Sequence, residues 1–537
     1  MTAETLSASP PPPRPAGNAA AGTAAGTAPR DRRAGSMPDL FGRGMLYVVV
    51  WSLQLVSASL VSAVLAHLLG PAEFGLLATA IAVHQVLVVF ATVGLDQAIV
   101  LERVRDEGSR AARGLLGVGL VAASLVMAVA AATSPWWGRW LGFGGATSLV
   151  VAVVLWTAPG AGVQLTMALL RSEDRLGPFA LLSCLSAIGG QAVGLTLLVA
   201  GTRDAGTYAW GGAVSFYAAL AAGIVLTRPR PAGLVAGEVL SRALRLGLPL
   251  VLGNLSVFVL NAGDRIVVQR FLGAAEAGRY QVAYTVGNVV LLLLVFTSQA
   301  WTPRIAAVDD VGERWLLAAR SRDELYRILV PVLLGVTLAA PVLLRVVAPA
   351  SFRPAGLLAV VFLVAVASVP LAAVGASGRA LVSVRRSHPL AVAAVLAAAA
   401  NVGLNLLLVP AVGLVGAAVA TVAAFALQAV LQRMALPARP RWPASGPAVL
   451  AAVTAAVAVA GLSVLLPQTG GWNAARFLVA LACLPWFLSR LRDARSGRAG
   501  PAGRHRRPRA RARSDGPSSA ARQSGSPVKR PRRPVPG

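Results

Sequence analysis

Two adjacent opposite charges, Asp264 and Arg265, stand at the end of an apolar run in the stretch LNAGDRIVVQRFLGAAEAGRY, residues 260–280. The planar guanidinium of arginine donates two hydrogen bonds at once and therefore suits phosphate. Neighbours on a helix point about 100° apart, so we expect Asp264 and Arg265 to need separate partners. Both stand toward the outer end of their apolar run, where Arg265 could instead extend to an interface. The pair is a candidate anion-binding and ion-coupling site.

Three further arginines in or beside apolar runs are candidates for contacts with an anionic ligand, namely Arg270, Arg43 and Arg345. A simpler role for Arg270 and Arg345 is extension to a membrane interface, and for Arg43 a topological anchor. His67 and His84 also stand in apolar runs, where they could relay protons or could be hydrogen-bonded between helices.

The elements that carry these residues are predicted to span a membrane. Of the 537 residues, 56% are hydrophobic and 13% are charged, whereas soluble domains carry about 25% charged residues. The apolar residues come in blocks of roughly 20, the length that crosses a bilayer. The sequence therefore predicts an all-α polytopic membrane protein with about fourteen helices, near 45–69, 74–94, 112–133, 147–170, 178–200, 207–227, 246–268, 279–300, 326–347, 355–376, 388–409, 411–432, 447–466 and 472–489.

Basic residues are distributed unevenly between alternate loops. Eight of the 49 lie in the spans or in one set of loops, and the remainder lie in the other set and at the chain ends. Because cytoplasmic loops are enriched in arginine and lysine, we expect a multi-pass protein of the cytoplasmic membrane with both termini cytoplasmic. The longest outward loop is predicted at 134–146, where Trp136, Trp137 and Trp140 are typical of an interfacial belt.

The two ends of the chain differ in composition from the spans. Residues 1–44 are rich in Pro, Ala, Gly and Thr and lack the apolar region of a signal peptide, which predicts a disordered cytoplasmic segment. The tail 490–537 is polybasic and predicted to be disordered. Held at a membrane, it is expected to bind anionic lipids rather than nucleic acid.

The chain contains an internal repeat. LGPAEFGLLATAIAV (69–83) and LGAAEAGRYQVAYTV (272–286) share seven of fifteen residues at an offset of 203. An even number of spans separates them, so the halves have the same orientation and are related by a two-fold axis along the membrane normal. Matching glycines predict turns, and prolines at a similar offset are either tolerated kinks or hinges. These residues are Gly70, Gly75, Gly273, Gly278, Pro159 and Pro370.

Several chemistries lack the residues that they need. Lys529 is the only lysine and stands in the tail, so the chain has no Walker A loop of its own. The four histidines show no metal-ligand spacing, and Cys184 and Cys483 both fall in apolar runs. The outward loops are short and nearly devoid of acidic residues. We therefore expect no enzyme, no metal and no cofactor.

The repeat segments resemble the polysaccharide-export flippases of the multidrug/oligosaccharidyl-lipid/polysaccharide exporter superfamily. The resemblance is carried by LLGPAEFGLLATAIAV (68–83), FATVGLDQAIV (90–100), DRIVVQRFLGAAEAGRYQVAY (264–284) and NLLLVPAVGLVGAAVAT (405–421). It implies alternating access of two six-helix lobes that flip an undecaprenyl-diphosphate-linked oligosaccharide to the outer leaflet. It also implies that Arg265 meets the diphosphate, while Asp264 pairs with an arginine of the opposite lobe or holds a proton. A polysaccharide polymerase and glycosyltransferases are the implied protein partners.

The resemblance and the repeat together predict the domain organisation. The N-lobe is expected at 45–227, a cytoplasmic linker at 228–245, the C-lobe at 246–432 and two additional helices at 447–489. Two alternatives remain open: a lipid II flippase, which shares this architecture, and a non-transporting membrane scaffold of a cell-envelope assembly complex. A scaffold needs no polar cavity between the lobes.

Overall fold

The computed structural model describes residues 53–54, 56–105, 109–299, 301–439 and 441–496. The whole predicted N-terminal segment 1–44 with the candidate Arg43, the start of the first span and nearly all of the basic tail lie outside these residues. Within them, thirteen helices are long and apolar enough to cross a membrane, and the shorter apolar helix Val56–Leu68 precedes them. This count confirms the expected all-α polytopic fold of about fourteen spans.

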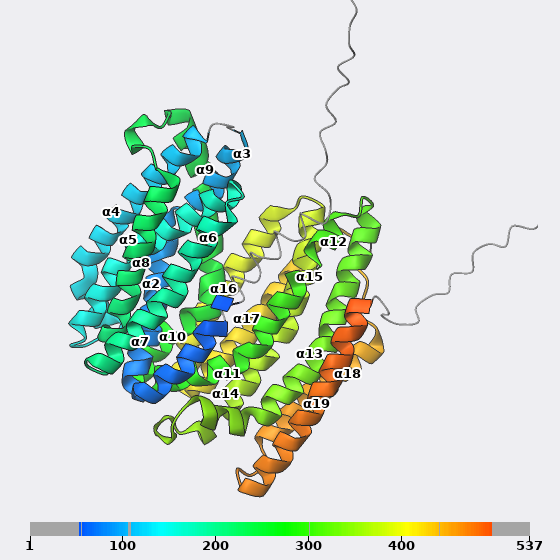
Figure 1. Ribbon diagram of the computed structural model, residues 1–537. Helices are drawn as coiled ribbons and strands as arrows, with labels where there is room; N and C mark the ends of the chain where they lie inside the picture. Colours follow the sequence, from blue (N-terminus) through cyan, green and yellow to red (C-terminus); the bar gives the residue numbers. More distant parts are fainter. Residues whose placement is uncertain (1–52, 55, 106–108, 300, 440, 497–537) are drawn as a thin grey trace, which may run out of the picture.

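The first half of the chain forms one bundle of helices, drawn in blue to cyan-green in Figure 1. Its elements after Val56–Leu68 are α2 (Pro71–Thr92), α3 (Leu95–Arg105), α4 (Arg110–Trp140), α5 (Thr147–Ser172), α6 (Leu176–Ser183), the π-helical segment η1 (Cys184–Gly189), α7 (Gly190–Ala200) and α8 (Ala205–Thr227). Gly70 precedes α2 and Pro71 stands in its first turn, where a missing N–H costs no helical hydrogen bond.

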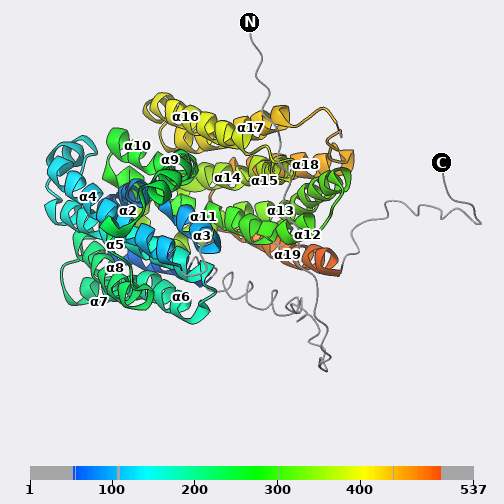
Figure 2. The same cartoon turned by 90° about the horizontal axis from the view of Figure 1, so that it is seen from above.

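Most of the second half forms a second bundle beside the first, drawn from green to orange, while its first long helix lies against the first bundle (Figures 1 and 2). After the short η2 (Ala232–Leu234) its elements are α9 (Gly237–Phe258), the π-helical η3 (Val259–Gly263), α10 (Asp264–Leu272), α11 (Ala274–Gln299), α12 (Thr302–Ala306), α13 (Val311–Val347), η4 (Ala350–Phe352), η5 (Pro354–Leu357), α14 (Leu358–Val366), α15 (Ser368–Ser383), α16 (Ser387–Val412), α17 (Leu414–Ala435), α18 (Pro447–Val464) and α19 (Gly470–Ser496).

The tryptophan segment near residue 136 is helical, so the prediction of a loop over 134–146 is wrong for most of its length. Helix α4 continues through Pro135 to Trp140. The Trp137 indole donates a hydrogen bond to the Ala130 carbonyl at 3.1 Å, which binds the last turns together. Trp136 and Trp140 remain largely exposed, as residues of an interfacial belt are.

The repeated glycines meet where the two bundles cross. A Cβ on Gly75 of α2 would lie 1.8 Å from the Ala274 carbonyl oxygen, and one on Gly278 of α11 would lie 2.1 Å from the Pro71 carbonyl oxygen. Both contacts follow the offset of 203, so the crossing is self-complementary, as a two-fold axis requires. Gly75 and Gly278 therefore lie inside helices and not in turns, which corrects the sequence-based prediction. Small residues let two membrane helices approach this closely.

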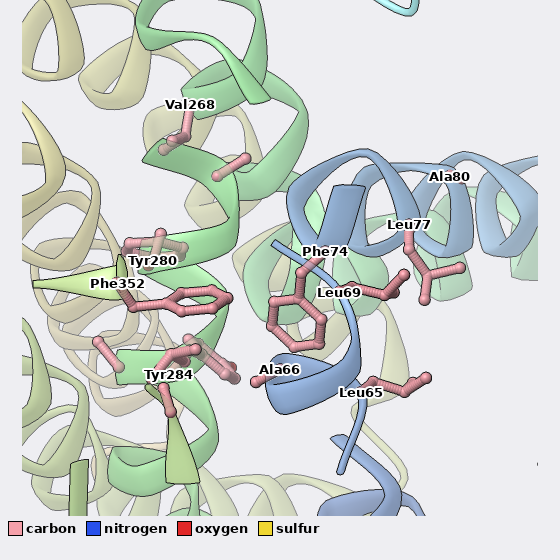
Figure 3. Packing of buried hydrophobic residues seen from close by; sticks show 14 of the residues in the cluster. Leu65, Ala66, Leu69, Phe74, Leu77, Ala80, Val268, Tyr280, Tyr284 and Phe352 are labelled. Atoms are coloured by element: carbon pink, nitrogen blue, oxygen red, sulfur yellow. The ribbon is translucent and has the colours of Figure 1, made fainter. Parts of the chain in front are cut away.

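Apolar side chains from both halves fill the space around this crossing. Figure 3 shows Phe74 of α2 opposite Phe352, with Tyr280 and Tyr284 of α11 on the Phe352 side. The Phe74 and Phe352 rings pack edge to face, with their centroids 5.8 Å apart. One buried cluster thus joins residues from both halves, and it closes the bundles against each other at this end.

Helix α9 packs against the first bundle at the opposite end of the molecule. Arg242 of α9 donates hydrogen bonds of 2.8 and 3.1 Å to the two carboxylate oxygens of Glu102 on α3. Nearby, a Cβ on Gly94, whose φ is +66°, would lie 2.2 Å from the Gly247 carbonyl oxygen. The first part of the seventh span therefore contacts the N-terminal bundle, while α10 pairs with α11.

The two candidate hinge prolines stand in different surroundings. Pro159 is buried inside α5, which is continuous from Thr147 to Ser172. Pro370 lies in the first turn of α15, just after the helix is interrupted at Ala367, where a proline removes no helical hydrogen bond. Their role as hinges stays a prediction.

Candidate functional site: a cavity between the two bundles

A cavity of about 280 Å³ lies between the two bundles, next to the α2–α11 crossing. Its walls come from the helix Val56–Leu68, α2, α7 and α8 of the first half and from η3, α10 and α11 of the second. Its polar lining residues are Ser62, Gln85, Gln191, Tyr208, Arg265 and Gln281. Of the candidate arginines in the described part of the chain, only Arg265 lines this cavity.

Arg265 is held by a set of hydrogen bonds on its own side of the cavity. Its Nη1 donates to the Asp264 carboxylate at 3.1 Å and to the Asn261 carbonyl at 2.9 Å, and its Nε donates to Gln281 Oε1 at 2.5 Å. Its guanidinium carbon lies 4.1 Å from the ring centroid of Tyr284, close enough for a cation–π interaction. The charged head is thus fixed in orientation before any ligand arrives.

The expectation that Asp264 and Arg265 need separate partners is wrong. Asp264 is 2% exposed and Arg265 is 7% exposed, and the two side chains form an ion pair. Asp264 also accepts a hydrogen bond from the Tyr280 hydroxyl, so its partners come from its own half of the chain and not from the opposite lobe. The long, flexible side chain of Arg265 can bend so that its guanidinium reaches the neighbouring Asp264 carboxylate. Burial also excludes an interfacial anchor for Arg265 in this conformation.

The π-helical segment η3 directly precedes this pair. The side-chain amide of Asn261 donates a hydrogen bond to the Val257 carbonyl at 2.7 Å. It therefore competes with main-chain N–H groups for that carbonyl. Single π turns of this kind often occur at functional sites. Here the segment positions the Asn261 carbonyl to accept from Arg265.

A second cavity of about 500 Å³ continues the first away from the α2–α11 crossing. The two share Ile81, Gln85 and Ala262 in their walls. A third cavity of about 180 Å³ shares Gln164 with the second and reaches Arg171, next to the loop before α6. Together they form a series from Arg265 to the end of the molecule at which α3 and α9 meet.

The second cavity has an aromatic wall. The His84 and Trp156 rings stack with centroids 4.4 Å apart, and Phe216 packs edge-on against both. Glycines make room for the stack: a Cβ on Gly160 would lie 2.8 Å from His84 Cε1, and one on Gly212 would lie 2.6 Å from Trp156 Cη2. His84 is therefore the candidate histidine that the structure places in the cavity.

Amide side chains supply the polar part of this second cavity. Gln85, Gln164 and Asn254 are exposed to it from α2, α5 and α9. Residues 157–163 of α5 are all buried, and Gln164 follows them as an exposed polar group. These amides are not among the ligand contacts predicted from the sequence, although an amide within an apolar span is a signal of a helix interface or wet cavity.

The remaining candidates lie away from the cavities. Arg270 is exposed on α10, Arg345 is exposed near the end of α13, and His67 is exposed with its Nδ1 2.9 Å from the Ala63 carbonyl oxygen of its own helix. None of the three lines the cavity series. As transport residues they have no support from this geometry.

Comparison with solved structures identifies the fold. The lipid II flippase MurJ in an inward closed conformation matches with a TM-score of 0.61 and 13% identity, over 84% of this chain and 99% of that chain. An inward-facing multidrug resistance MATE family transporter of the MOP superfamily matches with a TM-score of 0.52 and 16% identity, over 76% and 98%. A MATE protein in a straight conformation matches with a TM-score of 0.52 and 15% identity, over 78% and 96%. The three likenesses confirm the expected fold.

The sequence comparisons agree with this result. No curated protein matches the chain. A protein-family match described as "Polysaccharide biosynthesis protein" covers residues 64–356, which include both copies of the repeat and the Asp264–Arg265 pair. The family resemblance drawn from the repeat segments is thereby confirmed, and the chain belongs to this family of polysaccharide biosynthesis proteins.

Proposed function

We propose that the protein is a flippase that moves an undecaprenyl-diphosphate-linked oligosaccharide, the repeat unit of a polysaccharide, from the cytoplasmic to the outer leaflet. The observation that carries this proposal is the position of Arg265 on the wall of a cavity between two bundles related by a repeat. The cavity also argues against the scaffold alternative, since a scaffold has no need of one.

Arg265 is the group suited to the diphosphate. A buried cation raises the affinity of a cavity for an anion, and a guanidinium presents paired donors to phosphate oxygens. Asp264 and Tyr284 hold the guanidinium in place, so little conformational entropy is lost when a ligand binds.

The second cavity is suited to the sugars. Among the described residues that line it, none is acidic and none is a lysine or arginine, so it favours an uncharged saccharide. Aromatic faces pack against the apolar faces of sugar rings, and amides such as Gln164 and Asn254 both donate and accept hydrogen bonds with hydroxyls. We infer that the diphosphate occupies the first cavity while the glycan extends into the second.

We propose that transport proceeds by alternating access of the two bundles, and the arrangement of their contacts supports this. The bundles close at the α2–α11 crossing, and the cavities extend from there toward the arginine-rich loops near Arg171. The distribution of basic residues assigns those loops to the cytoplasm, so this conformation faces inward. The reverse tilt of the bundles would open the α2–α11 crossing and release the glycan outside.

The test is a flipping assay with purified full-length protein in liposomes. An undecaprenyl-diphosphate-linked repeat unit, lipid II and undecaprenyl diphosphate are each offered, and the fraction that reaches the opposite leaflet is measured. Flipping of the repeat unit faster than lipid II supports the proposal. Faster flipping of lipid II would favour the peptidoglycan alternative, and no flipping of any of the three would favour a scaffold.

A further inference from the structure

A separate cavity of about 680 Å³ lies inside the second bundle. Its lining residues come from α9, α12, α13, α15, α16 and α17 and from the turn at Arg385. Among the described residues, Val257 alone also lines the cavity series between the bundles. The polar lining residues of the separate cavity are Thr302, Arg314, Arg379, Ser383, Arg385, Gln428 and Gln432. No part of the proposed transport path described above uses these arginines.

Arg379 brings an incompletely satisfied cation to this cavity. Its Nη2 donates to Ser321 Oγ at 3.0 Å, but its Nε is buried with no hydrogen-bond acceptor among the described residues. Gln432 is 1% exposed and is in a similar position. Its Oε1 accepts from Ser377 Oγ at 2.7 Å, while its Nε2 is buried without an acceptor. Each side chain therefore has a buried N–H donor without an acceptor, and leaving such a donor unpaired costs free energy.

Two further arginines line the same cavity. Arg314 donates to the Val308 carbonyl and Arg385 stands at the turn between α15 and α16. No carboxylate lines the cavity, and no described acidic side chain forms an ion pair with Arg314, Arg379 or Arg385. Three cations that share one cavity without a counter-ion favour an anionic ligand.

The rest of the wall is apolar and includes Ile305, Val374, Val382 and Leu390. A free inorganic ion makes no use of such a wall, whereas the chain of an amphiphile buries against it. We propose that this cavity binds the phosphate head of an amphiphile, with the phosphate at Arg379, Arg385 and Gln432 and the apolar chain along α15 and α16. A polyprenyl phosphate and an anionic phospholipid share this chemistry. The proposal does not depend on Arg265 or on flipping.

The test measures binding to the full-length protein in phosphatidylcholine nanodiscs. Farnesyl phosphate is the probe, and phosphatidylglycerol and inorganic phosphate are the competitors. Arg379→Gln is expected to weaken farnesyl phosphate binding by roughly tenfold or more, the effect of losing a charge-assisted hydrogen bond. Arg385→Gln, at an exposed position, is expected to weaken it in the same direction. Arg320→Gln on α13, exposed and outside the cavity, is the matched control and is expected to leave the Kd unchanged.

The competitors distinguish the two sources of phosphate. Displacement by phosphatidylglycerol supports the proposal with a phospholipid as the ligand, and resistance to it supports the proposal with a prenyl phosphate. Displacement by inorganic phosphate at equal concentration would overturn it, because the apolar wall would then contribute nothing. The proposal is also overturned if the wild type does not bind farnesyl phosphate, or if Arg265→Ala abolishes binding while Arg379→Gln and Arg385→Gln do not.

Discussion

Gly75 of α2 and Gly278 of α11 lie against each other's helix backbones where the two halves of the chain meet. Each stands four residues after the residue whose carbonyl faces the other glycine, Pro71 in one half and Ala274 in the other. The two copies of the sequence repeat thus contact each other, and this contact closes one end of the cavity. A side chain larger than hydrogen at either position has to separate α2 from α11.

Gly75→Ala is therefore expected to weaken this closure. Overpacking of this kind costs about 1–3 kcal/mol, and the cost applies only to the conformation in which the crossing is closed. The cavity is probed with a chain that has Ser62→Cys as its only cysteine. Membrane-impermeant maleimide added on the α2–α11 side is expected to label this cysteine faster when Gly75→Ala is present than when Gly75 is kept. Gly403→Ala on α16 is the control, since no atom lies within 4 Å of its added Cβ. Equal labelling of the two variants would contradict the assignment.

Asp264→Asn is expected to change how transport depends on pH or membrane potential. The substitution keeps the shape of the side chain but removes the negative charge that balances Arg265 at 3.1 Å. Tyr280→Phe removes one hydrogen bond to the same carboxylate and leaves its charge, so it is expected to have the smaller effect. Flipping rates measured across a pH series and with imposed potentials check this. Superimposable profiles for Asp264→Asn and wild type would show that the carboxylate has no coupling role.

The proposed orientation is tested by reporter fusions along the chain. A fusion after residue 140, at the end of α4, is expected to report the outer side. Fusions after residues 240, 310 and 510 are expected to report the cytoplasm, as the arginine distribution requires. An external reporter at residue 310 would reverse the direction assigned to the cavity series.

Deletion of residues 491–537 is expected to leave membrane insertion and flipping largely intact. The removed segment is basic, and each such charge near an anionic surface contributes about 1 kcal/mol of attraction. Flotation of the protein's isolated tail region, fused to a soluble reporter, with vesicles that contain phosphatidylglycerol measures this attraction. A truncated protein that inserts normally but no longer flips would show that the tail takes part in transport.

The fold was largely predictable because membrane spans have a strong signal. Long apolar runs predicted the spans, and the repeat predicted two related bundles. Arg265 could also be singled out from the sequence as a candidate ligand contact, because a charge within an apolar run is costly and is kept where it has a use. Arg270 has nearly the same sequence context, yet it is exposed. Which face of a helix a residue occupies in the assembled bundle depends on packing that local sequence does not specify.

Other features depend on the conformation of single side chains or on contacts between distant segments. The pairing of Asp264 with Arg265 relies on the conformation of one long side chain and on the π turn before it. The cavity at Arg379 gathers residues from 257 to 432. Gly75 and Gly278 appeared to be turn glycines because each follows a helix break closely. Their actual role required knowledge of which helices cross.

The most direct test of the account compares Arg265→Ala with Arg270→Ala in the liposome flipping assay. The two arginines lie on the same helix, but only Arg265 lines the cavity. With equal amounts of folded protein, Arg265→Ala is expected to reduce flipping of the lipid-linked repeat unit by about 10- to 100-fold, the effect of one lost charge-assisted contact. Arg265→Lys is expected to restore it in part, and Arg270→Ala to match the wild type. Wild-type flipping by Arg265→Ala would contradict the claim that the diphosphate crosses the membrane at this residue.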